Sequence, residues 1–292
     1  MLLCEWLELW LTTYIDPLRA PSTGAGYRQA LKKLSPPFLG QKLTEIAALE
    51  VQREINRIGA NTPRQAQICL VALRSALKRA KRLGYVAENP AAETEQPRTR
   101  KREAAYLDAA ALRALLREAE KARSYRAILL MAVLGLRRGE ALGLQYGDIT
   151  EGHARIRRQR TARGALADLK TPASRRVLAL PEELLPILGT GKAEQQVCEV
   201  SATQLRRDLS AAAAAAGVGH VTPHMLRHTY ASLAISGGVQ MRVLQSLMGH
   251  AHYEVTADTY SHIYRPDMDA ASRIIYHSMQ HKPHYGARLE IV

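Results

Sequence analysis

A polar, basic segment without helical or strand periodicity interrupts this sequence after residue 90. Residues 91–104, AAETEQPRTRKREA, hold no large apolar side chain and four closely spaced basic residues. This composition is typical of an extended linker, because it offers too little apolar surface to join a core. At ~100–200 residues per domain, a chain of 292 residues has room for two. We therefore expect a domain at 1–95, a linker at 96–104 and a second domain with a C-terminal tail at 105–292.

The first domain shows the apolar spacing of helices. Trp6 and Trp10 lie on one stripe at helical intervals. Residues 62–83 give the clearest helix, which a Thr-Pro cap signal opens and Gly84 closes. The sequence therefore predicts a small helical domain.

The second domain is predicted to be mainly α with a small antiparallel β-sheet. Asp108 is typical of a helix N-cap, and residues 124–134 are apolar nearly all round, which favours a buried helix. Residues 153–160 and 175–180 alternate apolar and polar side chains and favour two strands, with a turn region at Gly164 between them.

An excess of basic residues indicates a polyanionic partner. The chain has 41 Lys and Arg against 27 Asp and Glu, a formal net charge of +14. Besides the linker, residues 155–176 hold eight basic residues against one acid. Such stretches attract phosphate backbones through charge and counterion release, although an isolated one is as often a solvated face. By itself the charge leaves DNA, RNA and acidic membranes open.

Cysteine use and hydropathy indicate a reducing compartment. The three cysteines, Cys4, Cys69 and Cys198, are odd in number and far apart, so no disulfide framework or cysteine-based zinc site is expected. The longest apolar runs are too short to span a bilayer, and the N-terminus lacks the basic start of a signal peptide. We therefore expect a cytoplasmic protein with no membrane partner.

Four short segments carry the candidate chemistry. They are GLRRGEALGLQYGD (135–148), LKTPASRRVLAL (169–180), HMLRHTYAS (224–232) and LMGHAHYEVTADTYSH (247–262). Each is a weak signal alone, but in this order and at these spacings they resemble the tyrosine recombinases, the phage integrase family. The resemblance covers 105–280 closely and 1–95 more loosely. It implies an N-terminal helical, SAM-like core-binding domain followed by an α+β catalytic domain.

The resemblance implies a six-residue catalytic set for breaking a DNA phosphodiester. A phenol with a pKa of ~10 needs cationic neighbours or a base to attack near neutral pH, and arginine offers a planar fork that matches phosphate oxygens. The family pattern makes the tyrosine the nucleophile, the arginines the phosphate clamp, the lysine the proton donor to the leaving oxygen, the first histidine an acid or base and the second a phosphate ligand. The set is Arg137, Lys170, His224, Arg227, His250 and Tyr260.

Neighbouring residues offer alternative interpretations. Tyr253 and Tyr264 lie close enough in the sequence to be alternative nucleophiles. His224 and His228 have the spacing of metal ligands on a helix, but residue 225 is not the glutamate of a zinc protease and no third ligand is implied. Glu140 matches an acidic position that supports structure in the family, or it is an ordinary surface acid.

The resemblance implies a site-specific recombinase, and in particular a phage-type integrase that integrates or excises a mobile element through a 3′-phosphotyrosine and a Holliday junction. It implies double-stranded DNA sites, a homotetramer on paired sites, a monomer or dimer when free, an accessory directionality factor and no metal or nucleotide cofactor. A plasmid or chromosome-dimer resolving recombinase and a non-cutting DNA-binding protein are the alternatives. No arm-type DNA-binding domain is expected before the core-binding domain. The expected DNA-binding residues are Arg98, Arg100, Lys101, Arg102 and Arg175.

Overall fold

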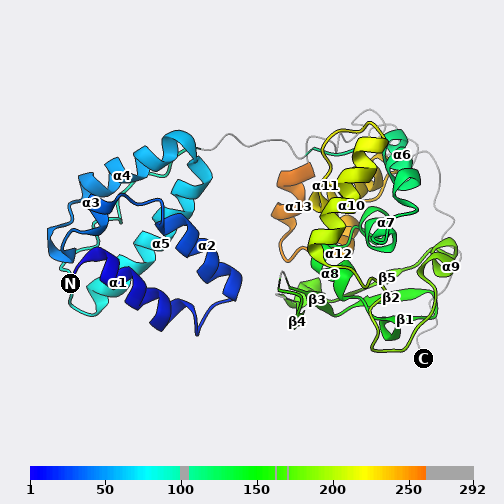
Figure 1. The fold of residues 1–292 in the computed structure, drawn as a ribbon, viewed down its shortest axis with the longest axis horizontal. Coiled ribbons are helices and arrows are strands. Elements are labelled where there is room, and N and C mark those ends of the chain that lie inside the picture. Colours follow the sequence, from blue (N-terminus) through cyan, green and yellow to red (C-terminus); the bar gives the residue numbers. More distant parts are fainter. Residues whose placement is uncertain (99–104, 162, 170, 261–292) are drawn as a thin grey trace, which may run out of the picture. The chain divides into compact units, whose positions relative to one another are not determined.

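The computed structural model describes residues 1–98, 105–161, 163–169 and 171–260. The chain divides into two units, Met1–Arg102 and Glu103–Val292, shown in Figure 1. Each unit has its own hydrophobic core. Both are mainly helical, and the antiparallel strands found in the described residues belong to the second unit, as the sequence predicts.

The first unit is a set of helices packed around two buried tryptophans, Trp6 and Trp10. The indole Nε1 of Trp6 donates a hydrogen bond of 3.1 Å to the carbonyl oxygen of Ala76 and so joins the first helix to the longest one. That longest helix confirms the prediction for residues 62–83. The elements are α1 (Leu3–Trp10), the π-helical turn η1 (Leu11–Ile15), α2 (Pro21–Leu31), α3 (Pro36–Leu39), the 3-10 turn η2 (Leu43–Glu45), α4 (Ala48–Asn61) and α5 (Pro63–Arg82).

The first residues of the polar segment 91–104, including Pro97 of the expected linker, pack against the first unit. Arg74 on α5 donates hydrogen bonds to the carbonyl oxygens of Ala91, at 3.0 Å, and Thr94. Gln67, also on α5, donates one of 3.0 Å to the carbonyl oxygen of Pro97. These side chains bind backbone carbonyls that composition alone assigns to solvent. The segment therefore belongs to the helical unit as far as Pro97.

The second unit surrounds the central helix α7 with further helices. The helices that contact α7 include α11, α8 and α6. Most side chains of α7 are buried, as its apolar sequence predicts. Asp108 caps α6 as expected, because its Oδ1 accepts a hydrogen bond of 2.7 Å from the backbone N–H of Ala111. The helices are α6 (Ala109–Ala119), α7 (Tyr125–Val133), α8 (Arg138–Gly143), α9 (Leu185–Leu188), α10 (Ala202–Ala215), α11 (Pro223–Ser236), α12 (Met241–Met248) and α13 (Tyr253–Tyr260), with 3-10 turns η3 (Tyr146–Asp148), η4 (Pro172–Ser174) and η5 (Glu182–Leu184).

Within the described residues the strands form two small sheets, where the sequence suggested one pair of strands. The first sheet has the order β1-β2-β5 and the second pairs β3 with β4. The expected strand 153–160 is interrupted at Arg157, because the side chains of Arg157 and Arg158 both bind the buried carboxylate of Asp148. The strands are β1 (Ile149–Thr150), β2 (His153–Ile156), β3 (Arg158–Arg160), β4 (Leu166–Asp168) and β5 (Arg176–Ala179).

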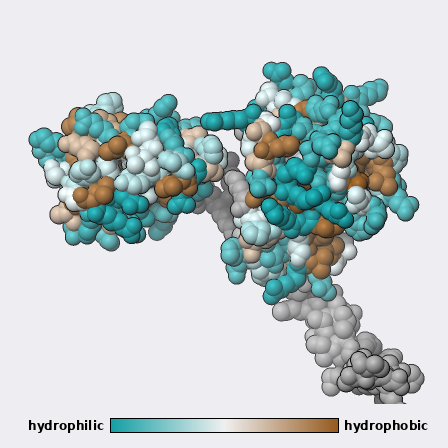
Figure 2. Space-filling view, turned by 90° about the horizontal axis from the view of Figure 1, so that it is seen from below, coloured by the Kyte–Doolittle hydropathy of each residue, from teal (hydrophilic) through white to brown (hydrophobic). Residues whose placement is uncertain are grey.

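Exposed hydrophobic side chains do not form one large patch on the face that Figure 2 shows, where they appear as separate areas between hydrophilic residues on both units. Among the exposed hydrophobic side chains of the second unit are those of Val177 on β5 and Val243 on α12. Within the described residues, no helix combines the length and the apolar character needed to cross a membrane.

Candidate active site

The turn between α7 and α8 depends on a glycine. Gly135 has a φ of +62°, which L side chains rarely adopt, and a Cβ there would overlap the ring of Tyr230 on α11. The carbonyl oxygen of Gly135 accepts a hydrogen bond of 2.6 Å from Nη1 of Arg227, also on α11. The turn therefore lies against α11 and places Arg137 at the start of α8.

Tyr260, the predicted nucleophile, ends α13 and contacts a histidine of α11. Its Oη lies 2.6 Å from Nδ1 of His228. The phenol ring is 1% exposed and packs with an apolar cluster of α11 and α12 that includes Ile235 and Leu244. Nδ1 of His228 is therefore within reach of the phenolic proton, the geometry that a general base needs.

Burial keeps both partners of this hydrogen bond neutral at pH 7. It raises the pKa of Tyr260 to about 12, although the charge of Arg227 acts in the opposite direction. Burial, followed by the charges of His224 and Arg227, lowers the pKa of His228 to about 4. The pair is therefore a phenol that keeps its proton and an uncharged imidazole that accepts the hydrogen bond.

Arg227 is buried and contacts the end of α12. Its Nη2 donates a hydrogen bond to the carbonyl oxygen of Met248 and lies 3.0 Å from Nε2 of His250. On the other side of the ring, Nδ1 of His250 lies 2.8 Å from Oγ1 of the buried Thr256. Because a guanidinium only donates, Nε2 of His250 is the acceptor and Nδ1 carries the proton. Burial, and then the nearby arginine charges, lower the pKa of His250 to about 4, so this neutral form is the stable one.

Glu140 is a buried carboxylate shared by three arginines. Oε1 accepts a hydrogen bond of 2.7 Å from Arg137, Oε2 accepts one of 2.9 Å from Arg176, and Nη1 of Arg227 lies 4.0 Å from Oε2. Burial raises the pKa of Glu140, but the hydrogen bond from Arg176 and the arginine charges outweigh it and bring the pKa below its usual value. One carboxylate therefore faces three guanidinium groups, which leaves positive charge for a phosphate.

Arg137 also reaches the turn after α12. Its Nη2 donates a hydrogen bond of 3.1 Å to the carbonyl oxygen of Gly249, which caps α12 in the left-handed conformation with a φ of +61°. The side chain of Arg137 is 39% exposed. Gly249 and His250 face an open hollow of about 590 Å³, which Arg175 and Arg242 also line. The turn therefore presents His250 to a basic surface depression.

Hydrogen bonds connect four of the six predicted catalytic residues into this region, namely Arg137, Arg227, His250 and Tyr260. His224 is exposed on α11, and its ring centroid lies 4.3 Å from that of His228. Partial desolvation of its ring, followed by the charges of Arg227 and Arg137, lowers the pKa of His224 although the residue is exposed. Lys170 lies outside the described residues, so its place in the site stays a prediction.

Two of the residues expected to bind DNA are in the described part of the chain. Arg98 is exposed. Arg175 is exposed as well, and its guanidinium lies 3.7 Å from the carboxylate of Asp168, which is also exposed. Arg100, Lys101 and Arg102 lie outside the described residues.

Two residues outside the predicted catalytic set, His228 and Arg176, hydrogen-bond members of this site. His228 directly follows Arg227 and fits the family pattern at that place, and its spacing of one helical turn from His224 also suggested a metal motif, but neither feature indicated that it contacts Tyr260.

Arg176 ends the family pattern Lys-Thr-x-x-Ser-x-Arg that begins at Lys170, and no role was expected for it beyond its charge in the basic stretch 155–176. The signal for its burial was the predicted strand 175–180. Because neighbouring residues of a strand point to opposite faces, only one of Arg175 and Arg176 is expected to face the interior.

The described residues do not gather three His, Cys, Asp or Glu side chains in a position to hold a metal ion. His228 hydrogen-bonds Tyr260 through Nδ1. The geometry therefore gives the metal interpretation of the His224–His228 pair no support.

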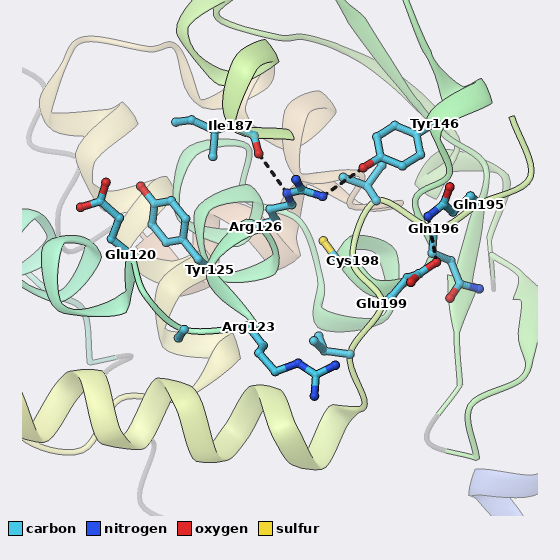
Figure 3. Close-up of a pocket in the computed structure, with 13 residues that line it drawn as sticks. Glu120, Arg123, Tyr125, Arg126, Tyr146, Ile187, Gln195, Gln196, Cys198 and Glu199 are labelled. Atoms are coloured by element: carbon cyan, nitrogen blue, oxygen red, sulfur yellow. Dashed lines mark hydrogen bonds between the residues drawn. The ribbon is translucent and has the colours of Figure 1, made fainter. Parts of the chain in front are cut away.

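A cavity of about 400 Å³ near the start of α7 shares no lining residue with this site. Figure 3 shows Arg126 reaching across it, where Nε donates a hydrogen bond of 2.9 Å to the Ile187 carbonyl oxygen and Nη1 one of 3.0 Å to the Tyr146 hydroxyl. Burial raises the pKa of Cys198, in the same wall, to about 12, so it is an unreactive thiol. Arg126 therefore connects structural elements here.

The chain matches two models of one family. The model of the phage integrase family matches residues 105–266, and that of the phage integrase N-terminal SAM-like domain matches residues 2–59. The chain is also similar to the tyrosine recombinase XerC of Pelobacter propionicus, with 29% identity over 263 residues, which cover 84% of this chain and 85% of that protein.

Solved structures show the same fold. The integrase of transposon Tn1549, solved with transposon right end DNA, has a TM-score of 0.74 and 16% identity, covering 95% of this chain and 99% of that one. The structure of a lambda integrase tetramer bound to a Holliday junction has a TM-score of 0.66 and 19% identity, covering 86% of this chain and 78% of that one. Since the family model spans more than half of the sequence, this chain belongs to the phage integrase family of tyrosine recombinases, enzymes that cut and rejoin DNA at specific sites.

Proposed function

We propose that this recombinase integrates or excises a mobile DNA element through a covalent 3′-phosphotyrosine. The observation that carries the proposal is the 2.6 Å contact between Oη of Tyr260 and Nδ1 of His228, beside the linked Arg227 and His250. A nucleophile paired with a base, close to fixed cationic donors, is what cleavage of a phosphodiester requires.

In the first step Oη of Tyr260 forms a bond to phosphorus as the bond from phosphorus to the 5′ oxygen breaks. We assign the phenolic proton to His228 and the non-bridging phosphate oxygens to Arg137, Arg227 and His250. Because Tyr260 and Arg227 are each about 1% exposed, DNA binding has to uncover them before attack.

The departing 5′ oxygen needs a proton, and we assign its donation to Lys170, as the family resemblance implies. Rejoining reverses the step. The 5′ oxygen of a partner-strand hydroxyl bonds to phosphorus and gives its proton to Lys170, while the bond from phosphorus to Oη of Tyr260 breaks and His228 returns its proton to that oxygen. One phosphodiester bond is exchanged for another at each transfer, so the bond energy is conserved without an external energy source.

Exchange between two DNA sites needs four strand cleavages, and we propose a homotetramer that carries them out through a Holliday junction. Lambda integrase, which shares this fold, has been solved as a tetramer bound to such a junction. The net charge of +14 supports assembly on DNA, because counterion release favours the binding of basic surfaces.

Resolution of chromosome or plasmid dimers is the second candidate role. The similarity to XerC, which extends over 84% of the chain, favours it. The sequence Ala257–His262 around the nucleophile favours the integrase role. The two roles differ in the DNA that is joined, since integration joins two different sites and dimer resolution joins two copies of one site.

A covalent trap tests the proposed chemistry. Purified protein is incubated with nicked fragments of host and element DNA and denatured, and the DNA that stays attached is sequenced. We expect an adduct with the native chain and none with Tyr260→Phe. Adducts that persist in Tyr260→Phe would exclude this nucleophile. Specific DNA binding without any adduct would favour the non-cutting DNA-binding protein.

The sequences recovered from the adducts separate the two roles. Integration predicts cleavage at the ends of a mobile element and at a different host site. Cleavage at a single sequence whose recombination partner is another copy of itself would reject integration in favour of dimer resolution.

A further inference from the structure

Arg176 joins three segments of the active site through one guanidinium group. Its Nη2 donates a hydrogen bond of 2.9 Å to Glu140, its Nε one of 2.7 Å to the carbonyl oxygen of Leu247, and its Nη1 one of 3.0 Å to that of Ser174. The side chain is 7% exposed. Its donors therefore point to protein acceptors, and any effect on the reaction has to pass through the residues that it holds.

Two of these segments orient predicted catalytic groups. Glu140 binds both the backbone N–H and Nη1 of Arg137. Leu247 stands two residues before Gly249, whose carbonyl oxygen accepts from Arg137 and whose left-handed turn leads to His250. A shift of Arg176 would therefore move Arg137 and His250 together.

The third segment is the turn Thr171–Ser174, which follows position 170. The two hydroxyl oxygens of Thr171 and Ser174 lie 2.9 Å apart, and the N–H of Ser174 donates to the Thr171 carbonyl oxygen at 3.1 Å. A Cβ on Gly249 would lie 3.0 Å from Nη1 of Arg176 and 3.2 Å from Cα of Ser174. The turn and the end of α12 are therefore packed tightly around Arg176.

We propose that Arg176 is a positioning residue of the recombinase, which fixes the Glu140 carboxylate, the Gly249 turn and the Thr171–Ser174 turn in the one arrangement that cleaves DNA. The inference rests on the proposed function, because the arrangement matters for activity only if this site cuts DNA. Displacement of reacting groups by ~1 Å costs on the order of 100-fold in rate. One buried guanidinium is therefore enough to control the cleavage rate without touching the phosphate.

The test compares Arg176→Gln and Arg176→Lys with a matched control, Arg126→Gln. Arg126 also donates to a carbonyl oxygen and a second acceptor within the second unit, but in a cavity that shares no lining residue with the active site. Three quantities are measured. They are the rate of adduct formation at saturating nicked duplex, the affinity for that duplex, and amide hydrogen exchange of the free protein at residues 171–176 and 246–250.

We expect Arg176→Gln to form the adduct ~10–100-fold more slowly while the affinity for DNA changes by less than about 3-fold. Amide exchange should become faster at Gly249 and His250. Arg176→Lys should recover part of the rate, because its charge still faces Glu140 but its ammonium group cannot bind all three acceptors. Arg126→Gln should leave the cleavage rate and the exchange at 246–250 unchanged.

The proposal is overturned if Arg176→Gln cleaves at the native rate, or if Arg126→Gln slows cleavage equally, since that would show a general loss of stability. Unchanged exchange at 246–250 in Arg176→Gln would also overturn it. The duplex is the one recovered with the native chain. If the native chain forms no adduct, the proposed function fails, and the exchange measurement still decides whether Arg176 holds the turn.

Discussion

Tyr260 and His228 hydrogen-bond each other at 2.6 Å, although 32 residues separate them in the sequence. Both are neutral at pH 7, because burial raises the pKa of the phenol to about 12 and lowers that of the imidazole to about 4. The hydroxyl of Tyr260 can therefore donate to Nδ1 of His228, and the single N–H proton of the neutral imidazole is then on Nε2. These pKa values keep the proton on the phenol in the free protein. Transfer along this bond, which would place positive charge on a ring next to His224, therefore has to be coupled to attack on the phosphate.

Replacing His228 by Asn tests the proton acceptor. Asparagine can still accept a hydrogen bond but cannot take up the proton, so we expect adduct formation to slow by ~100-fold or more. The measurement is the single-turnover rate on nicked duplex, with His224→Asn measured in parallel. A larger loss in His224→Asn than in His228→Asn would assign the base to His224, as the sequence pattern alone suggests.

Stability should fall in mild acid because His228 and His250 are held neutral. Both have a pKa of about 4 in the fold, whereas an unfolded histidine titrates near ~6.5. Between these values the unfolded chain binds protons that the folded chain does not. The stabilisation is therefore complete above pH ~6.5 and is lost as the pH falls towards 4, by up to ~1.4 kcal/mol per pH unit for each histidine.

Urea unfolding between pH 7 and pH 5 measures this dependence. His228→Asn and His250→Asn should each flatten the curve, whereas His252→Asn, which changes an exposed histidine, should retain the native profile. Parallel curves for all four proteins would show that the buried histidines do not cause the dependence.

Gly249→Ala should impair both stability and cleavage. Its φ of +61° makes any Cβ unfavourable, by ~1–2 kcal/mol, and this Cβ would also approach Arg176 and Ser174 closely. Gly84→Ala is the matched control, because Gly84 has a φ of +78° with no atom within 4 Å of the added Cβ. Thermal unfolding should show the larger loss in Gly249→Ala, and only this variant should cleave more slowly. Equal losses of stability would mean that backbone strain alone acts.

Binding to DNA should weaken steeply with salt. The logarithm of affinity falls by ~0.9 per logarithm of salt for each phosphate neutralised, so replacing an arginine that contacts a phosphate should reduce the slope by about 1. Arg98 and Arg175 are exposed, and fluorescence titration of Arg98→Gln and Arg175→Gln at several salt concentrations tests them one by one. An affinity of the native chain that does not change with salt would contradict backbone binding.

Local signals made much of the fold predictable. The boundaries of α5 and the Asp108 cap follow from residues within a few positions of each helix end, and both are confirmed. The strand predicted at 153–160 was too long, because its break depends on the buried carboxylate of Asp148. Ion pairs between an arginine and a distant carboxylate do not change the alternation of apolar and polar residues, so the sequence pattern does not reveal the break.

The same distinction holds for the site. Motif spacing predicts Arg227, His250 and Tyr260 as members of the site. The hydrogen-bond partner of Tyr260, in contrast, depends on how α13 packs against α11. Arg176 could not be separated from Arg175 by charge, and only the sheet decides which of them is buried. Hydrogen bonds between distant elements therefore mark the limit of what the sequence showed.

The variant Glu140→Gln tests whether Glu140 orients Arg137 for cleavage in addition to stabilising the fold. Removing the charge leaves Arg137, Arg176 and Arg227 with no buried anion, and breaking such a pair costs ~3–5 kcal/mol. Glu140 is ionised at a pKa below the ordinary 4.5, so this contribution is present above about pH 4.5 and is lost as the pH falls below it. At pH 7 the variant should show the full loss of stability and a reduced cleavage rate.

Asp148→Asn is the control for this experiment, because Asp148 is equally buried and pairs with Arg157 and Arg158 instead. We expect urea unfolding to give losses of similar size for both variants. Single-turnover cleavage, measured at a temperature where both are folded, should fall by ~10–100-fold in Glu140→Gln and stay close to the native rate in Asp148→Asn. Equal cleavage rates in the two variants would mean that Glu140 stabilises the fold without orienting Arg137, since the loss of either buried anion would then have the same effect.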